Sequence, residues 1–447
     1  MGRRLAPAAA AAAALGLTWM APAAQAETPY AEVVQLCRDL YGDTFGTPNT
    51  EPLGPCQWDM ALIGAGDESY ADATGAGVTV GVIDSGIQVD HPDIAANLDL
   101  ARSCSFITAG TPTAAPEEVA DGDCSDTAAL TDYDGHGTHV ASTIAAPVNG
   151  VGIAGVAPEA TIVALKACTE QGYCFADAIA SALRYAGDEG LDVVNLSLYA
   201  DPYLYFCQDD AGQREVVAEV RAAARYAQQH GVTIVAAAAN SRADLQHPRT
   251  DDTSPNWPPG TEVEREIRNN CVELPAELPE ALTVSATGPV GYPGWDQDIA
   301  SYSNVGMGRV DVTAPGGNYF VASGTVQDAI LAATPAAGPT WGFFDGLSAV
   351  YPGLTTTQDG FGYTYYSGTS QASPHAAGVA ALIVERHPRW SPKAVQAAVE
   401  RTATPMTCPA GWEPLDADDE RDRCYGNGGR TSFFGHGMVD ALAAATS

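Results

Sequence analysis

The sequence predicts an α/β protein with a mostly parallel central sheet and helices on both faces of that sheet. Short apolar runs rich in β-branched residues recur along the chain, and segments with helical periodicity separate them. The runs cover residues 78–83, 161–165, 193–198, 232–238 and 282–286, and the helical segments include residues 175–186 and 215–230. Near-continuous apolar strands that alternate with helices are typical of a parallel sheet buried on both faces.

The N-terminus has the features of a secretory signal peptide over residues 1–26. Arg3 and Arg4 precede an alanine-rich apolar stretch, and Ala24-Gln25-Ala26 is a small-x-small cleavage site. We therefore expect a secreted, extracellular protein, with the periplasm as the alternative location.

Residues 27–55 are interpreted as a short N-terminal extension, and residues 56–447 as one domain with loop insertions. Polar stretches interrupt the α/β pattern without any repeat, and they cover residues 109–130, 200–213, 242–280 and 320–363. Segments of the same α/β pattern flank each stretch, which favours decorated loops over separate domains.

The composition narrows the range of partners. The chain has 447 residues, with 21 Lys plus Arg against 55 Asp plus Glu and a formal charge of −34. This excess of negative charge argues against nucleic acid as a partner, because phosphates require clustered cations. No apolar stretch of about 20 residues follows the N-terminus, so we expect no membrane anchor. We also expect a monomer.

Ten cysteines fit an oxidising compartment. All of them follow residue 26, and an even number is what a set of disulfides requires. Zinc binding is the alternative, but no CxxC or paired-histidine spacing is present. The sequence does not determine the connectivity, and our working hypothesis pairs each cysteine with its neighbour in sequence: 37–56, 104–124, 168–174, 207–271 and 408–424.

Three motifs carry the chemistry, and the first is Asp84 at the end of the strand predicted over residues 78–83. Sites in open α/β sheets lie beyond the carboxyl ends of the strands. A carboxylate in that position can be held rigidly against a histidine. Taken alone, however, Asp84 is also consistent with a turn residue that ends a strand.

The second motif places two histidines, His136 and His139, beside a helix predicted over residues 140–146. Small residues around His136 allow close approach of other groups. Metal binding by the pair is the alternative, but ligands on one helix face usually stand four residues apart with an acid between them. Here the spacing is three residues without that acid, so we predict that His136 is catalytic and His139 structural.

The third motif places Ser370 before a helix predicted over residues 376–385, with Pro374 in its first turn. Backbone N–H groups at a helix N-terminus favour a developing negative charge. A Gly-Thr-Ser turn alone is common, so this motif indicates a catalytic serine only in combination with the other two motifs.

Asp, His and Ser occur in the chain order that is typical of subtilisins. Over residues 56–447 the chain resembles the subtilisin-like serine proteases. The resemblance implies a three-layer α/β fold and a secreted serine endopeptidase that works through a covalent acyl-enzyme. It makes Ser370 the nucleophile, His136 the base and Asp84 the group that orients the imidazole. The alternative is a catalytically silent, secreted binding protein on the same scaffold.

The resemblance also implies further site residues. Asn240 matches the oxyanion asparagine of the family, and Ser197, Leu198 and Tyr199 match the segment that pairs with an extended substrate. Three departures stand near these positions: Tyr199-Ala200 replaces a glycine pair, Ala239 replaces a glycine, and Gln371 replaces a methionine. The first of these puts the broad apolar preference of the family in doubt.

No cofactor is expected for the chemistry, whereas structural calcium is one expectation. Asp93 and Asn149 match positions that hold calcium in many members of the family. The extension over residues 27–55 is too short for an independently folded propeptide. A bridge between Cys37 and Cys56 would be worth about 3 kcal/mol in the chain-entropy model, so we expect this extension to remain packed on the mature domain.

Overall fold

The computed structural model describes residues 30–120, 124, 126–293, 299–335, 355–358, 361–409, 423–427 and 429–447. Its centre is a seven-stranded sheet with the order β11-β10-β6-β4-β1-β3-β2, in which neighbouring strands run parallel. The strands are β1 (Thr79–Asp84), β2 (Cys104–Ser105), β3 (Thr161–Lys166), β4 (Val193–Leu196), β6 (Thr233–Ala237), β10 (Ala281–Thr287) and β11 (Val312–Pro315). The five predicted strands are therefore all present.

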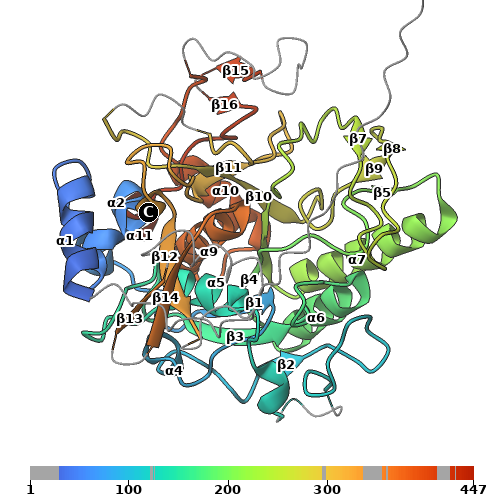
Figure 1. Ribbon diagram of the computed structural model, residues 1–447, viewed down its shortest axis with the longest axis horizontal. Helices are drawn as coiled ribbons and strands as arrows, with labels where there is room; N and C mark the ends of the chain where they lie inside the picture. The colour runs from blue at the N-terminus through green and yellow to red at the C-terminus, as the bar shows by residue number, and fades with distance from the viewer. Residues whose placement is uncertain are drawn as a thin grey trace, which may run out of the picture.

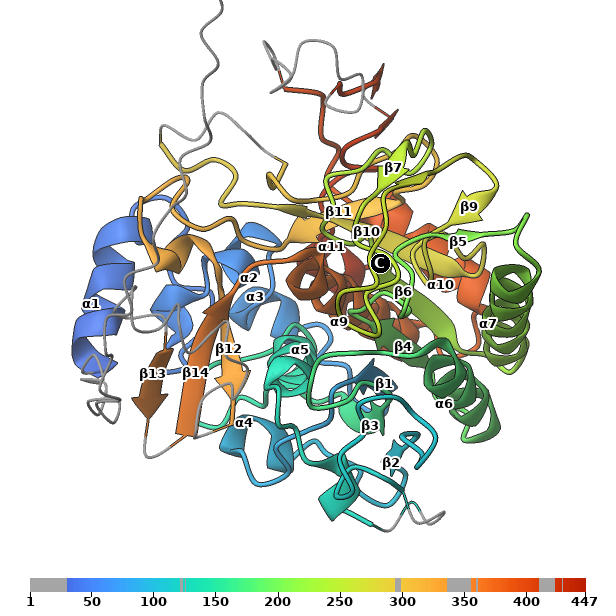
Figure 2. The same cartoon turned by 45° about the vertical axis from the view of Figure 1, so that its right-hand side comes forward.

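Helices cover both faces of this sheet, as Figures 1 and 2 show. Along β3, Ile162 and Ala164 pack toward one hydrophobic core, and Val163 and Leu165 pack toward the other. The first core contains α5 (His136–Ala145), α9 (Thr369–Arg386) and α10 (Pro392–Thr402), and the second contains α6 (Ala176–Asp188) and α7 (Ala211–Gln229). The predicted three-layer α/β arrangement is confirmed.

A second sheet forms where the sequence predicted a loop insertion over residues 320–363. It is antiparallel with the order β12-β14-β13, and its strands are β12 (Ile330–Thr334), β13 (Thr355–Gln358) and β14 (Phe361–Tyr366). Helix α1 (Tyr30–Tyr41) belongs to the same hydrophobic cluster, in which Val33 and Cys37 join Tyr363 and Tyr365. In Figure 1 this region lies on the left, away from α6 and α7.

Short elements complete the described part of the chain. The small helices are α2 (Trp58–Leu62), α3 (Asp67–Tyr70), α4 (Pro92–Ala95) and α11 (Ala441–Ala445). Two-residue strands pair as β5 (Phe206–Cys207) with β9 (Cys271–Val272), β7 (Thr250–Asp251) with β8 (Arg265–Glu266), and β15 (Gly426–Asn427) with β16 (Arg430–Thr431). Within the same residues, no helix combines the length and apolar character that a membrane crossing would need.

The five cysteine pairs predicted from sequence order are all bonded in the structure. They are Cys37–Cys56, Cys104–Cys124, Cys168–Cys174, Cys207–Cys271 and Cys408–Cys424. The predicted signal segment, residues 1–26, lies outside the described residues.

Two helix boundaries differ from the prediction. Helix α5 begins at His136 rather than at residue 140, and α9 begins at Thr369 rather than at residue 376. Pro374 therefore lies inside α9, which places Ser370 within the first turn of that helix. The prediction treated the proline as a start signal, but tertiary contacts of the preceding turn extend the helix past it.

Candidate active site

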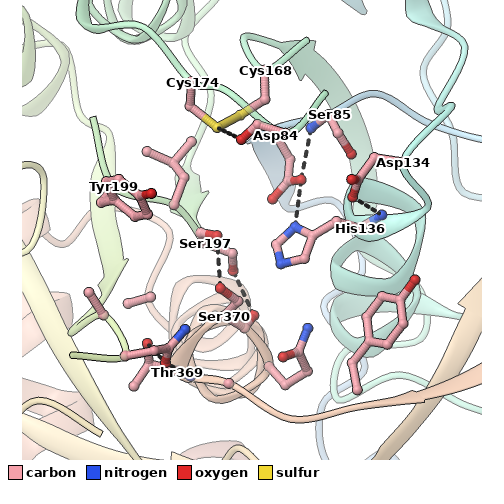
Figure 3. A pocket seen from close by; sticks show the side chains of 18 of the residues that line it. Asp84, Ser85, Asp134, His136, Cys168, Cys174, Ser197, Tyr199, Thr369 and Ser370 are labelled. Carbon is pink, nitrogen blue, oxygen red and sulfur yellow. Dashed lines mark hydrogen bonds and ion pairs between the residues drawn. A yellow bond between two sulfur atoms is a disulfide. The ribbon is translucent and has the colours of Figure 1, made fainter. Parts of the chain in front are cut away.

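The predicted residues meet in one cleft at the carboxyl ends of the central strands (Figure 3). Asp84 is the last residue of β1, Ser197 follows β4 directly, and Asn240 lies three residues beyond β6. His136 and Ser370 enter from the first turns of α5 and α9. Because the sheet is parallel, its strands end at the same edge, and the chain thereby collects polar groups from distant segments.

Asp84 and His136 form an ion pair at the wall of this cleft. Asp84 Oδ1 lies 2.8 Å from His136 Nδ1 and also accepts the backbone N–H of Ser85 at 2.8 Å. Burial by itself would lower the pKa of His136, but the charge of Asp84 and its hydrogen bond outweigh burial and raise that pKa to about 9. The His136 side chain is 26% exposed, so solvent screens part of this upward shift.

Ser370 and Ser197 are joined by two reciprocal hydrogen bonds. Ser370 Oγ donates to the Ser197 carbonyl at 3.0 Å, and Ser197 Oγ donates to the Ser370 carbonyl at 2.7 Å. The second bond has a local cause: Pro374 has no N–H, so it cannot satisfy the Ser370 carbonyl within α9. The hydroxyl of Ser197 takes over that role and holds the first turn of α9 against the end of β4.

A buried polar side chain, Asn195, stabilises the same contact. Asn195 in β4 donates from Nδ2 to Ser197 Oγ at 2.8 Å and accepts from Ser373 Oγ at 2.5 Å. Sequence analysis missed Asn195 and Ser373. Asn195 had one signal in the sequence, its polarity within an apolar strand, whereas Ser373 lay before the helix predicted over residues 376–385.

The amide of Asn240 has a fixed orientation. Its Oδ1 accepts the backbone N–H and the hydroxyl of Thr369, each at 2.9 Å. Nδ2 has no hydrogen bond to the residues that the structure describes, and it lies 3.5 Å from the point where a Cβ on Gly368 would stand. The preceding residue, Ala239, has a φ of +69°, a backbone conformation that favours glycine. The structure thus explains why glycine is the usual residue there.

Ser197, Leu198 and Tyr199, which are expected to bind the substrate, line the cleft. Tyr199 receives a hydrogen bond on its hydroxyl from Asn256 Nδ2 at 3.1 Å, and the same amide donates to Asp201 Oδ1 at 2.5 Å. Asn256 belongs to the predicted insertion over residues 242–280, so this insertion folds back onto the rim of the cleft. Nothing in the sequence signalled that contact.

His139 is structural, as predicted. Its Nε2 lies 3.1 Å from the carbonyl oxygens of Ile330 and Thr364, and its ring stacks on Tyr366. Burial lowers the pKa of His139 to about 3, so the ring is neutral and donates to these carbonyls. The alternative of a shared metal site with His136 finds no support in this arrangement.

At the two positions expected to hold calcium, hydrogen bonds within the chain engage the side chains of Asp93 and Asn149. Asp93 Oδ2 accepts the N–H of Ile153 at 3.1 Å, Oδ1 lies 3.4 Å from Asn149 Nδ2, and Tyr363 also bonds to this carboxyl. N–H donors therefore occupy oxygens that would bind a cation, and Asn149 Oδ1 accepts the N–H of Val151. Burial raises the pKa of Asp93 to about 7.

Comparison with known proteins decides the family. The model of the subtilase family (peptidase S8) matches residues 75–437. The chain belongs to the subtilase family. It is 29% identical over 387 residues to M-protease of Shouchella clausii (strain KSM-K16). That alignment covers 87% of this chain and 69% of M-protease. It is 28% identical over 387 residues to subtilisin BL of Lederbergia lenta, covering 87% of this chain and 97% of the relative.

Solved structures agree with this assignment. The crystal structure of a lanthipeptide protease is 25% identical and superposes with a TM-score of 0.60, covering 87% of this chain and 93% of the other. Fervidolysin from Fervidobacterium pennivorans is 26% identical, with a TM-score of 0.59 over 89% of this chain and 46% of that protein. The protein is thus a serine peptidase of the subtilase family with the subtilisin-like fold.

Proposed function

We propose that this subtilase is a secreted endopeptidase that hydrolyses peptide bonds with the triad Asp84, His136 and Ser370. The observation that carries this proposal is the 2.8 Å pair between Asp84 and His136 in the cleft that also contains Ser370. A carboxylate bonded to Nδ1 fixes the tautomer in which Nε2 can accept a proton.

In the proposed mechanism, Ser370 attacks the carbonyl carbon of the scissile peptide bond. His136 takes the seryl proton as general base and then gives it to the leaving amine, while Asp84 stabilises the imidazolium that forms between these steps. Water then hydrolyses the acyl-enzyme by the same route. Ser370 Oγ now donates to the Ser197 carbonyl, so it must leave that bond before it can donate to His136.

Asn240 is proposed to stabilise the oxyanion. Its Oδ1 is held by Thr369, which directs Nδ2 toward the turn that precedes Ser370. The backbone N–H of Ser370, in the first turn of α9, is the second donor. No cofactor takes part in this chemistry. Peptides or proteins are the proposed partners of the Ser197–Tyr199 segment, and we propose a monomer.

Labelling with a serine-directed fluorophosphonate tests the proposal. We expect stoichiometric labelling and peptide hydrolysis by the wild-type protein, and neither by Ser370→Ala. The melting temperature should hardly change, because the hydroxyl of Ser370 makes one hydrogen bond. A protein that neither reacts with the phosphonate nor cleaves a peptide library would instead be the silent binding protein, and a variant Ser370→Ala that keeps its activity would contradict the triad.

We also infer export and retention of the N-terminal extension. Five disulfides are consistent with an oxidising compartment. Residues 30–41 form α1, and the bridge Cys37–Cys56 ties this helix to the rest of the domain. N-terminal sequencing of the active, secreted protein should start near Glu27, whereas a start near Cys56 or beyond would reject retention.

A further inference from the structure

The loop that carries Asn240 begins with a strained residue. Ala239 has a φ of +69°, and a non-glycine residue keeps this conformation only where the surrounding structure holds it. Asn240 itself is exposed, so close packing does not fix its position. Thr369 bonds to its side chain from the side of α9 only. A further group must therefore hold the backbone of this loop.

Asn304 holds that backbone on both sides of Asn240. Its backbone N–H donates to the Ala239 carbonyl at 3.0 Å, and its Oδ1 accepts the N–H groups of Ser241 at 3.0 Å and Ala243 at 2.8 Å. Asn304 lies in the segment between β10 and β11, is fully buried, and is not among the residues that line the cleft. It therefore contacts the loop but would not touch a substrate.

A buried carboxyl group fixes which way the amide of Asn304 points. Nδ2 donates to Glu273 Oε2 at 2.9 Å, and Glu273 Oε1 has no hydrogen-bond partner among the described residues. Both side chains are fully buried. Burial raises the pKa of Glu273 well above its usual range, and the bond from Asn304 opposes that rise. With the amide reversed, Nδ2 would face two N–H donors, so only one orientation satisfies both residues.

Ser303 attaches this arrangement to the central sheet. Its hydroxyl accepts the N–H of Ala286 in β10 and donates to the Asn304 carbonyl, each at 3.0 Å. The N–H of Val305 donates to the Ala243 carbonyl at 2.9 Å. A central strand thus anchors the group that holds the loop, and a rigid support of this kind is what an accurately placed donor requires.

We infer that Asn304 is a positioning residue, which holds Asn240 where its amide meets the oxyanion, and that Glu273 keeps Asn304 in the required orientation. The inference rests on the proposed function and adds two residues outside the cleft to the proposed oxyanion site. An oxyanion donor acts over about 2.7–3.1 Å, and a misplacement of about 1 Å can cost about 100-fold in rate. Loss of Asn304 should therefore lower kcat rather than weaken substrate binding.

The test is a double-mutant cycle between Asn304 and Asn240 in the full-length protein. Asn304→Ala should lower kcat by about 10- to 100-fold and leave KM within about threefold. In the Asn240→Ala background, the same change should lower kcat by less than about threefold, because residues that act as one unit are not additive. Steady-state rates are normalised to the sites that the phosphonate labels.

The matched control is Asn49→Ala, which removes a buried amide far from the cleft in sequence and outside its lining. Asn49 Nδ2 donates to Gln57 Oε1 at 2.9 Å, and Oδ1 accepts the N–H of Glu51 at 3.0 Å. We expect this variant to lose unfolding stability as Asn304→Ala does, with kcat within about threefold of wild type. An equal fall of kcat in the control would overturn the inference, because kcat would then report general destabilisation.

A reversed pair tests the inference even where Asn304→Ala does not fold. Asn304→Asp keeps the acceptor for the loop but sets two carboxyl groups against each other, and it should lower kcat. Adding Glu273→Gln restores a donor across the pair and should return kcat to within about threefold of wild type. A double variant no more active than Asn304→Asp would overturn the inference, as would additive losses in the cycle with Asn240→Ala. Wild-type protein that neither cleaves peptides nor reacts with the phosphonate would instead reject the proposed function itself.

Discussion

The parallel central sheet and the antiparallel sheet beside it use their polar groups in opposite ways. At the carboxyl ends of β1, β4 and β6, polar side chains line a cleft, and Asn240 Nδ2 has no hydrogen bond to the residues that the structure describes. In the antiparallel region, polar side chains form hydrogen bonds between elements that pack against each other. Tyr41 Oη donates to Asp328 Oδ1 at 2.6 Å, and Trp58 Nε1 donates to the carbonyls of Gln327 and Ala329.

This difference indicates that activity and stability are carried by different regions. Polar groups left open cost stability and provide chemistry, whereas satisfied polar groups specify one packing arrangement. Substitutions in the cleft should therefore reduce turnover with little effect on unfolding. Substitutions around α1 and β12 should do the reverse.

The largest effect is expected from Asn240→Ala. Loss of the amide donor should lower kcat by about 10²- to 10³-fold, a magnitude measured on subtilisin itself and carried over to this relative. The melting temperature should fall by no more than a few degrees, since only the two hydrogen bonds that Asn240 accepts from Thr369 are lost. Steady-state kinetics normalised to phosphonate-labelled sites provide the measurement, and a kcat within threefold of wild type would remove Asn240 from the oxyanion site.

The two histidines should respond to pH in opposite directions. Turnover needs neutral His136, whose pKa is raised to about 9 by Asp84, so the acid limb of kcat/KM should lie above the ordinary value of about 6.5. His136 also stabilises the fold below about pH 6.5, and this contribution is lost as the pH rises through 9. His139, with its pKa lowered to about 3, instead costs stability as the pH falls below about 6.5.

Rate and unfolding measurements from pH 4 to pH 11 test both histidines. An acid limb at or below pH 6.5 would show that the charge of Asp84 does not govern His136. The variant His139→Gln, which lacks a titrating ring, should lose less stability between pH 6.5 and pH 4 than the wild-type protein does.

Removal of the bridge between Cys37 and Cys56 should affect stability rather than rate. The double variant Cys37→Ser/Cys56→Ser should lose about 3 kcal/mol of unfolding free energy, as the chain-entropy model gives for this loop length. The matched control is Cys408→Ser/Cys424→Ser, which opens a loop of similar length between partly exposed cysteines. Since Cys37 and Cys56 are buried, their loss should cost more than the control, and equal losses would argue against a tightly packed extension.

The smallest effect is expected from Tyr41→Phe. This change deletes the hydroxyl that donates to Asp328 in a buried setting and should cost about 1–3 kcal/mol, with kcat unchanged. The control is Tyr226→Phe, whose exposed bond to Asp188 should contribute within about 0.5 kcal/mol. Denaturant unfolding compares the two, and equal costs would mean that the contact of α1 with residue 328 is not a stabilising one.

The sequence by itself determined the features that depend on local pattern. The central strands follow from short apolar runs. The positions of Asp84, His136 and Ser370 follow from motifs in which the reacting residue and its small neighbours are contiguous. Each of these signals lies within a few residues, so it is present in the sequence before any tertiary contact forms.

Only the tertiary structure decided which contacts form between distant segments of the chain. We predicted a loop over residues 320–363 because this stretch is rich in threonine, glycine and proline. Its strands β12 and β14 form by pairing with each other and by packing against α1. The start of α9 at Thr369 depends on Ser197, which replaces the bond that Pro374 cannot make. Contacts such as Tyr41 with Asp328 span 287 residues, and no local pattern encodes a partner at that separation.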